Sequence, residues 1–187
     1  MAIFITSQRL EAIQQDTQLR EKFLEELIDE YCHSILWLAF TYVKDQQLAE
    51  EVMQDVFLTC YNRIDAFRNQ SSIKTWMYRI TVNKCKDELR KKSLKNFLLK
   101  QGEDQNNLRS DQQHPGDLLV QEVEDELLAQ RVMSLPLKFR EVIYLFYFEE
   151  MQIKEISKTF GIKENTVKTR LNRGRRMLRK MYEKEGE

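Results

Sequence analysis

The chain has 187 residues, of which 42% are hydrophobic and 32% charged, with five Gly and two Pro; these proportions are typical of a helix-rich protein of one or two small domains. No stretch approaches the ~20 consecutive apolar residues of a membrane span, and residues 1–6 lack the basic segment of a signal peptide, so we expect a cytoplasmic protein. Cys32, Cys60 and Cys85 are widely spaced, which predicts buried free thiols rather than a metal site, and no cofactor is expected.

The formal net charge of zero conceals four blocks of alternating sign. Residues 1–66 carry 12 acidic against 5 basic side chains, and residues 101–134 carry 8 against 2. Residues 67–100 instead carry 10 basic against 2 acidic side chains, and residues 135–187 carry 13 against 8. Two separated basic blocks predict two contacts with nucleic acid. The acidic blocks indicate either a basic protein partner or repulsion from DNA that sharpens docking.

Three amphipathic helices are predicted in the first half of the chain. Apolar side chains recur at helical spacing over residues 20–43 and again over 46–65, where Asp45 is a suitable N-cap. Ser71 or Ser72 can cap a third helix that runs to about Lys92. The basic residues on the outer face of this helix favour contact with phosphates, although cations near a helix C-terminus are also favoured by the helix dipole.

A polar, aperiodic stretch separates these helices from the second half. It runs from Leu99 to about Gly116 and predicts a linker at a domain boundary. Helical spacing returns over 117–133, stops at Pro136 and resumes over 139–148. No strand alternation persists, so we predict an all-α protein. Its two small helical domains would be residues 1–95 and 117–187, joined by a flexible linker at 96–116.

The most informative segment follows, between Ile153 and Arg176. A short apolar stripe ends at Phe160, Gly161 supplies a residue suited to a tight turn, and a second helix follows, with Asn165 as its expected N-cap. This is the layout of a helix-turn-helix, whose second helix enters the DNA major groove. Donors suited to bases and phosphates lie on one face of that helix: Lys168, Thr169, Asn172, Arg173 and Arg176. An ordinary helix pair with a solvated basic face is the alternative.

Three motifs, in this order and spacing, resemble bacterial RNA polymerase sigma factors of the extracytoplasmic-function group. Residues 49–58 resemble the helix that binds core polymerase, and 75–83 with the basic run to 92 resemble the helix that reads and melts the minus-10 element. Residues 135–143 with the helix-turn-helix resemble the domain that reads the minus-35 element. The chain departs from the family at 162–165, where Pro and Gly are more usual.

The resemblance implies a protein that is not an enzyme and assigns three sets of contact residues. The core-binding set is Glu51, Gln54, Asp55 and Tyr61. The minus-10 set is Arg68, Asn69, Ser71, Lys74, Arg79, Asn83, Lys86 and Arg90. The minus-35 set is Lys168, Thr169, Arg170, Asn172, Arg173 and Arg176. The loop 67–75 would capture a flipped minus-10 base, whereas the register of Trp76 with Ile73 and Ile80 favours a core role for that indole over a melting wedge.

The resemblance also implies partners. They are the coiled coil of the largest subunit of core RNA polymerase, promoter DNA, and a membrane-anchored anti-sigma factor that controls a stress or envelope response. The acidic linker would either imitate nucleic acid in a basic channel or serve only as a solvated tether.

Two rival classes of protein fit the residues less well. A DNA-binding regulator with a sensor domain predicts strands or a ligand pocket in the first half, and the spacing there indicates neither. A recombinase or nuclease needs an activated Ser or Tyr among arginines, or clustered carboxylates, and no convincing nucleophile–base pair stands out.

Overall fold

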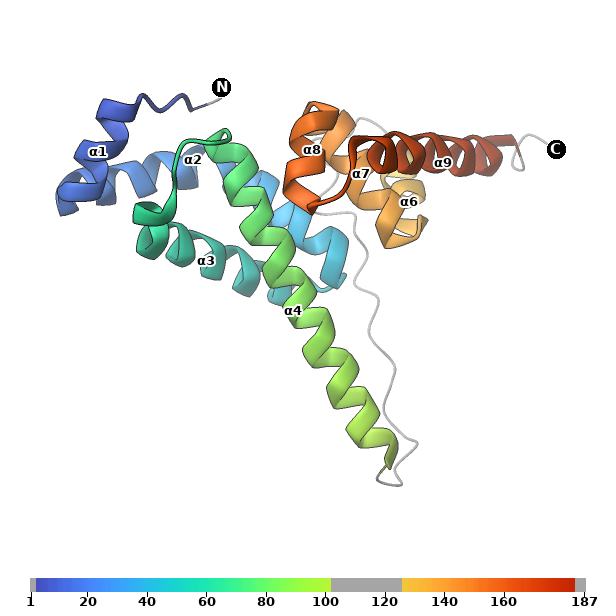
Figure 1. The fold of residues 1–187 in the computed structure, drawn as a ribbon. Helices are drawn as coiled ribbons and strands as arrows, with labels where there is room; N and C mark the ends of the chain where they lie inside the picture. Colours follow the sequence, from blue (N-terminus) through green and yellow to red (C-terminus); the bar gives the residue numbers. More distant parts are fainter. Residues whose placement is uncertain (1–2, 102–125, 184–187) are drawn as a thin grey trace.

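The computed structural model describes residues 3–101 and 126–183, and every regular element within these ranges is a helix. The predicted all-α class is therefore confirmed. The helices form an N-terminal bundle (residues 3–101) and a C-terminal bundle (residues 126–183), which lie side by side (Figure 1). Among the residues that the structure describes, none of the helices combines the length and the apolar character needed to cross a membrane.

The N-terminal bundle contains α1 (Ser7–Gln15), α2 (Thr17–Val43), α3 (Gln46–Arg63), the short 3-10 helix η1 (Ile64–Ala66) and α4 (Ile73–Gln101). The junctions follow local chemistry. The Asp16 carboxylate caps α2, Lys44 ends α2 in the left-handed conformation at φ 55°, and the Asp45 carboxylate accepts the Leu48 N–H at 2.9 Å to begin α3. At the start of α4 the Ser72 hydroxyl oxygen accepts the Thr75 N–H at 3.2 Å. Both caps predicted for these helices are thus confirmed.

Two features of this bundle were not predicted from the sequence. The helix α1 precedes the expected helices and buries Leu10 and Ile13. The helix α4 continues past Lys92 to Gln101, into the range expected to be linker, and projects beyond the other helices of its bundle (Figure 1). The remainder of the expected linker, and residues 117–125 of the helix predicted next, lie outside the described residues.

The C-terminal bundle contains α6 (Glu126–Ser134), α7 (Leu137–Tyr147), α8 (Ile153–Phe160) and α9 (Glu164–Glu183). Pro136 separates the first two, as predicted, and the buried Arg140 guanidinium donates to the Met133 and Leu135 carbonyl oxygens at 2.5 and 3.2 Å. Gly174 lets α9 approach α7 closely, because a Cβ at that position would lie 3.0 Å from Ile143 Cγ1.

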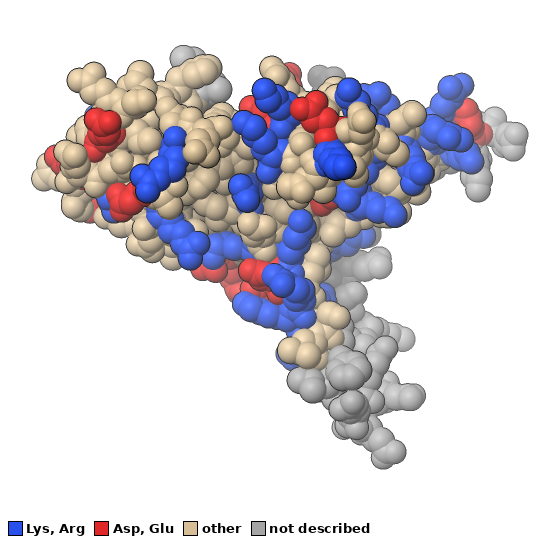
Figure 2. All heavy atoms as spheres, in the orientation of Figure 1, with Lys and Arg blue, Asp and Glu red and all other residues tan. Residues whose placement is uncertain are grey.

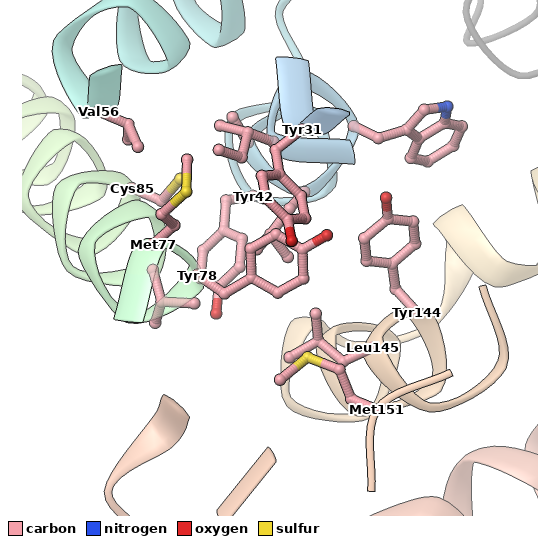
Figure 3. Close-up of a cluster of buried hydrophobic side chains, with 14 of the residues drawn as sticks. Tyr31, Tyr42, Val56, Met77, Tyr78, Cys85, Tyr144, Leu145 and Met151 are labelled. Atoms are coloured by element: carbon pink, nitrogen blue, oxygen red, sulfur yellow. The ribbon is translucent and has the colours of Figure 1, made fainter. Parts of the chain in front are cut away.

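The two bundles share one hydrophobic core. The helix α2 packs against α7, and α4 packs against α8. Buried side chains of α2, α3 and α4 belong to one cluster with Tyr144, Leu145 and Met151 of the C-terminal bundle (Figure 3). The sequence predicted two linked domains but not this contact, which we call the seam.

Candidate nucleic-acid and polymerase interfaces

The helix-turn-helix is built by α8 and α9. Gly161 ends α8 at φ 65°, and the Ile162 N–H donates to the Ser157 carbonyl oxygen at 3.1 Å, which closes the turn. The predicted cap of the second helix is wrong. The helix α9 begins at Glu164, and the Lys163 carbonyl oxygen accepts the N–H groups of Thr166 and Val167, so Asn165 lies within the first turn rather than before it.

The outer face of α9 presents most of the predicted minus-35 set to solvent. The exposed members are Lys168, Thr169, Asn172, Arg173 and Arg176. Arg170 departs from this group: it is half-buried, and its Nη1 lies 2.7 Å from Glu141 Oε1. Figure 2 shows basic side chains gathered over α8 and α9 and along α4. The exposed face combines cations with amide and hydroxyl groups, the chemistry of phosphate positioning and base readout.

The predicted minus-10 set divides into exposed and half-buried side chains. The exposed members are Arg68, Asn69, Arg79, Asn83, Lys86 and Arg90, and Ser71 is half-buried. Lys74 is half-buried and engaged: its Nζ lies 3.0 Å from Glu149 Oε2 and donates to the Glu149 carbonyl oxygen at 2.8 Å. Trp76 is half-buried against the Phe67 ring, with ring centroids 5.3 Å apart, so its indole packs in the bundle as predicted.

The loop before α4, residues 67–72, is held by hydrogen bonds to residues near the N-terminus. The Gln14 side-chain amide donates to the Ile64 carbonyl oxygen at 3.0 Å and also lies 3.4 Å from that of Phe67. Asn69, in the left-handed conformation at φ 54°, donates from its side chain to the Ile5 carbonyl oxygen at 3.2 Å. Gln14 and Ile5 therefore brace this loop.

The predicted core-binding set lies along α3. Glu51, Gln54 and Asp55 are exposed, and Tyr61 is half-buried, with the Arg20 guanidinium 5.9 Å from its ring centroid. Asp55 also forms a 3.2 Å ion pair with Lys84 of α4. Leu58, 58% exposed, continues the same outward stripe and was missed. Its signal in the sequence was an apolar residue at helical spacing among polar ones.

Two buried carboxylates dominate the seam. Glu149 receives hydrogen bonds from the hydroxyls of Tyr78 and Tyr144, and it pairs with Lys74. The Tyr144 hydroxyl lies 2.7 Å from Glu149 Oε1 and 3.1 Å from the Ser34 carbonyl oxygen, so its one proton favours the shorter contact. Glu141 receives the Tyr42 hydroxyl and pairs with Arg170. Each carboxylate is thus bonded by a tyrosine of the opposite bundle.

The two carboxylates have pKa values shifted in opposite directions. Burial alone would raise the pKa of Glu149, but the hydrogen bond from Tyr78, the charge of Lys74 and the hydrogen bond from Tyr144 outweigh it and hold the pKa below its ordinary value. Burial prevails at Glu141 and raises its pKa, despite the Tyr42 hydrogen bond and the Arg170 charge. Burial and the facing carboxylates raise the pKa of Tyr78 and of Tyr42, so both phenols stay protonated donors.

Comparisons with known proteins place the chain in a family. Residues 27–94 match the family Sigma-70 region 2, and residues 125–178 match Sigma-70, region 4. The chain is 32% identical over 161 residues to the ECF RNA polymerase sigma factor SigW of Bacillus subtilis, covering 83% of this chain and 86% of that protein. The chain belongs to the extracytoplasmic-function sigma factors. The resemblance found in the sequence is therefore confirmed. Sigma factors direct transcription initiation and are not enzymes.

Other matches agree with this assignment. The sigma factor SigV of Bacillus subtilis is 31% identical over 176 residues, covering 90% of this chain and 96% of that protein. Among solved structures, the sigma factor RpoE in complex with the anti-sigma factor NepR from Bartonella quintana has a TM-score of 0.66 at 20% identity, covering 87% of this chain and 98% of that one. CnrH in complex with the cytosolic domain of CnrY has a TM-score of 0.63 at 18% identity, covering 94% of each chain. At these identities the two solved structures support only the fold of this sigma factor.

Proposed function

We propose that this sigma factor binds core RNA polymerase through α3 and directs initiation at promoters read by its two bundles. Residues 1–95 would bind core and the minus-10 element, residues 117–187 would read the minus-35 element, and residues 96–116 would link them. The observation that supports this proposal best is the exposed face of α9, where Lys168, Asn172 and Arg173 stand free on a folded helix-turn-helix.

The face of α3 supports the polymerase part of the proposal. Its exposed carboxylates, Glu51 and Asp55, would meet a basic coiled coil of the largest subunit, and charge complementarity would set the orientation and speed of docking. Leu58 would add an apolar anchor one turn beyond Asp55, and apolar anchors beside polar contacts concentrate binding energy in protein interfaces.

Run-off transcription tests the function directly. Purified chain would be added to sigma-free core polymerase on fragments of the host genome. We expect discrete transcripts only when the chain is present, and their upstream sequences would define both promoter elements. DNA binding by the chain without any transcript would instead identify a regulator that acts independently of core polymerase.

An anti-sigma factor is the further partner that we propose, with a role in a stress or envelope response. The structural neighbour RpoE is described in a complex with the anti-sigma factor NepR, and CnrH in a complex with the cytosolic domain of CnrY. A chain purified from host cells should be bound to a membrane-anchored protein before induction and to core polymerase afterwards. Finding it on core polymerase under both conditions would remove the anti-sigma proposal and leave the sigma activity standing.

A further inference from the structure

The seam covers part of the surface that we assign to minus-10 DNA, and this inference rests on that proposed function. Lys74, at the start of α4, is a predicted phosphate or base contact, yet in the closed chain its ammonium group is held by Glu149. A carboxylate with two hydrogen-bonding oxygens resembles a phosphate in charge and in acceptor geometry. Glu149 therefore occupies the position that a DNA phosphate would take beside Lys74.

The helix α8 covers the adjoining loop. Lys158 Nζ donates to the Gln70 carbonyl oxygen at 3.1 Å, and Ser72 Oγ lies 3.4 Å from Glu155 Oε1. Farther along α4, Lys86 Nζ lies 6.0 Å from the centroid of the Phe160 ring. Contacts from the C-terminal bundle thus extend along the loop and the first turns of α4, where a flipped base and its phosphates would bind.

The space left beside the loop is acidic. A cleft of about 720 Å³ lies between Ile3–Ile5, the loop Asn69–Lys74 and the segment after α7. Among the described residues in its walls, the carboxylates outnumber the single cation, Lys74; they are Glu30, Glu149, Glu150 and Glu155. Carboxylates focused into a concave site repel a polyanion. The closed chain therefore opposes DNA at this place by charge as well as by contact.

The other two proposed surfaces remain largely free in the same arrangement. Glu51, Gln54 and Asp55 of α3 are exposed, as are Lys168 and Arg173 of α9. The seam engages Arg170 of the minus-35 set through Glu141. It leaves the exposed residues of α3 and the rest of the minus-35 set accessible while it engages part of the minus-10 surface, and is in this sense selective.

We propose that the C-terminal bundle is an intramolecular competitor for minus-10 DNA, released only when the seam opens. The closed chain can dock on core polymerase through α3 and can present α9, but it binds the minus-10 strand only after Lys74 exchanges Glu149 for a phosphate. If DNA binds only the open state, the measured affinity equals the intrinsic affinity multiplied by the fraction of the chain that is open. The competitor thus suppresses promoter binding by the free chain and orders the steps of assembly.

The chemistry of the seam suits a contact that opens. Its aromatic residues include Tyr42, Tyr78 and Tyr144, whose rings pack as apolar surface while their hydroxyls bond the carboxylates. Once exposed, each hydroxyl and carboxylate regains hydrogen bonds to water, so opening leaves no polar group unpaired. Trp37 stacks on Tyr144 across the seam, with ring centroids 5.7 Å apart, and reports directly on this contact.

Glu149→Gln removes the charge that holds Lys74. Glu150→Gln is the matched control, since Glu150 is exposed and its substitution removes the same charge from the same cleft, whereas the ion pair of Lys74 is with Glu149. Trp37 emission would be measured in the full chain carrying Trp76→Phe, and the radius of gyration by small-angle X-ray scattering. Binding would be measured, with Trp76 present, to core polymerase and to a fork DNA with a single-stranded minus-10 element, taken from the promoters that run-off transcription defines. Tyr78→Phe, which deletes only a hydroxyl from the opposite side of the seam, repeats the test if Glu149→Gln folds poorly.

For Glu149→Gln we expect red-shifted Trp37 emission, a larger radius of gyration and at least about tenfold tighter fork binding by the free chain, tenfold corresponding to about 1.4 kcal/mol. Affinity for core should change by less than about twofold, since α3 is free in both states. Unchanged emission and fork affinity in both variants would overturn the competitor. A tenfold gain in core affinity would overturn the order of steps. Failure of the wild-type chain to bind core at all would instead reject the proposed function.

Discussion

Gln14 and Phe67 are joined across the N-terminal bundle, with the Gln14 amide nitrogen 3.4 Å from the Phe67 carbonyl oxygen and 3.0 Å from that of Ile64. This contact ties α1 to the loop that we assign to minus-10 capture. The helix α1 precedes the residues that match Sigma-70 region 2, yet it holds the backbone of that loop.

Gln14→Ala should therefore loosen the loop. We expect a loss of stability of about 1 kcal/mol from the missing hydrogen bonds, together with weaker discrimination among minus-10 sequences in run-off transcription. Gln15→Ala, an exposed neighbour on the same helix, is the control for stability and for activity. Equal minus-10 selectivity in the two variants would show that the contact is structural only.

The face of α9 predicts a loss confined to promoter reading. Lys168→Ala combined with Arg173→Ala should lower promoter-specific transcription at least about 30-fold, because each good base contact is worth about 1–3 kcal/mol. Core affinity should not change. Arg179→Ala with Lys180→Ala removes the same charge from the exposed end of the helix and should have a much smaller effect. Loss of core binding in the first pair would contradict the division of labour between the bundles.

The face of α3 predicts the converse loss. Gln54→Ala with Asp55→Arg should weaken core binding at least about tenfold, roughly 1.4 kcal/mol, and spare minus-35 DNA binding by the free chain. Asp55 also pairs with Lys84, so Lys84→Met tests whether the internal ion pair matters. If Lys84→Met alone reproduces the loss of core affinity, the effect lies in the ion pair rather than in a polymerase contact.

The lowered pKa of Glu149 predicts a pH-dependent difference in stability. A carboxyl whose pKa is depressed in the folded chain stabilises it above the unfolded value, about 4.3, and loses this contribution as the pH falls through the folded value. The melting temperature of the wild type should therefore exceed that of Glu149→Gln at pH 7, and the gap should narrow below about pH 5. Lys74, Tyr31, Tyr78 and Tyr144 face Glu149 and are present in both proteins, as are Glu141 and Glu155. A gap that stays constant down to pH 3 would rule out this linkage.

Gly174 predicts a packing defect in the helix-turn-helix. A valine at this position would press on Ile143 Cγ1 and Cδ1, which lie 3.0 and 3.3 Å from the point that its Cβ would occupy, and should destabilise the fold by about 1–3 kcal/mol. Thermal unfolding measures the change. Asn172→Val, exposed on the same helix, controls for the helix propensity of valine. If Gly174→Val and Asn172→Val had equal melting temperatures, α7 would have shifted to accommodate the added side chain.

Helical spacing predicted most of the fold, because the apolar stripes of these helices are long and their caps are local. The helix α1 was not predicted because it is short and its buried side chains are those of Leu10 and Ile13. Thr6 and Asp16 are nevertheless typical capping residues. The end of α4 was set too early because the strongly basic run from Arg90 was interpreted as a helix terminus.

The candidate surfaces could be predicted where a residue simply faces outward, as Gln54 and Arg173 do. The engagement of Lys74 and Arg170 could not, since it depends on contacts between residues far apart in the chain. One sign was present. Glu141 interrupts a strongly apolar helix, α7, and a buried carboxylate there needs partners that local patterning does not reveal.

The seam also bears on how far the two halves can be exchanged. Tyr42 and Tyr78 come from one bundle, and the carboxylates that they bond come from the other. A chimera that joins this N-terminal bundle to another sigma factor's C-terminal bundle would inherit only one side of the contact. Such a hybrid would lack the closed form. Its promoter preference would then be measured without the proposed competition between the C-terminal bundle and minus-10 DNA.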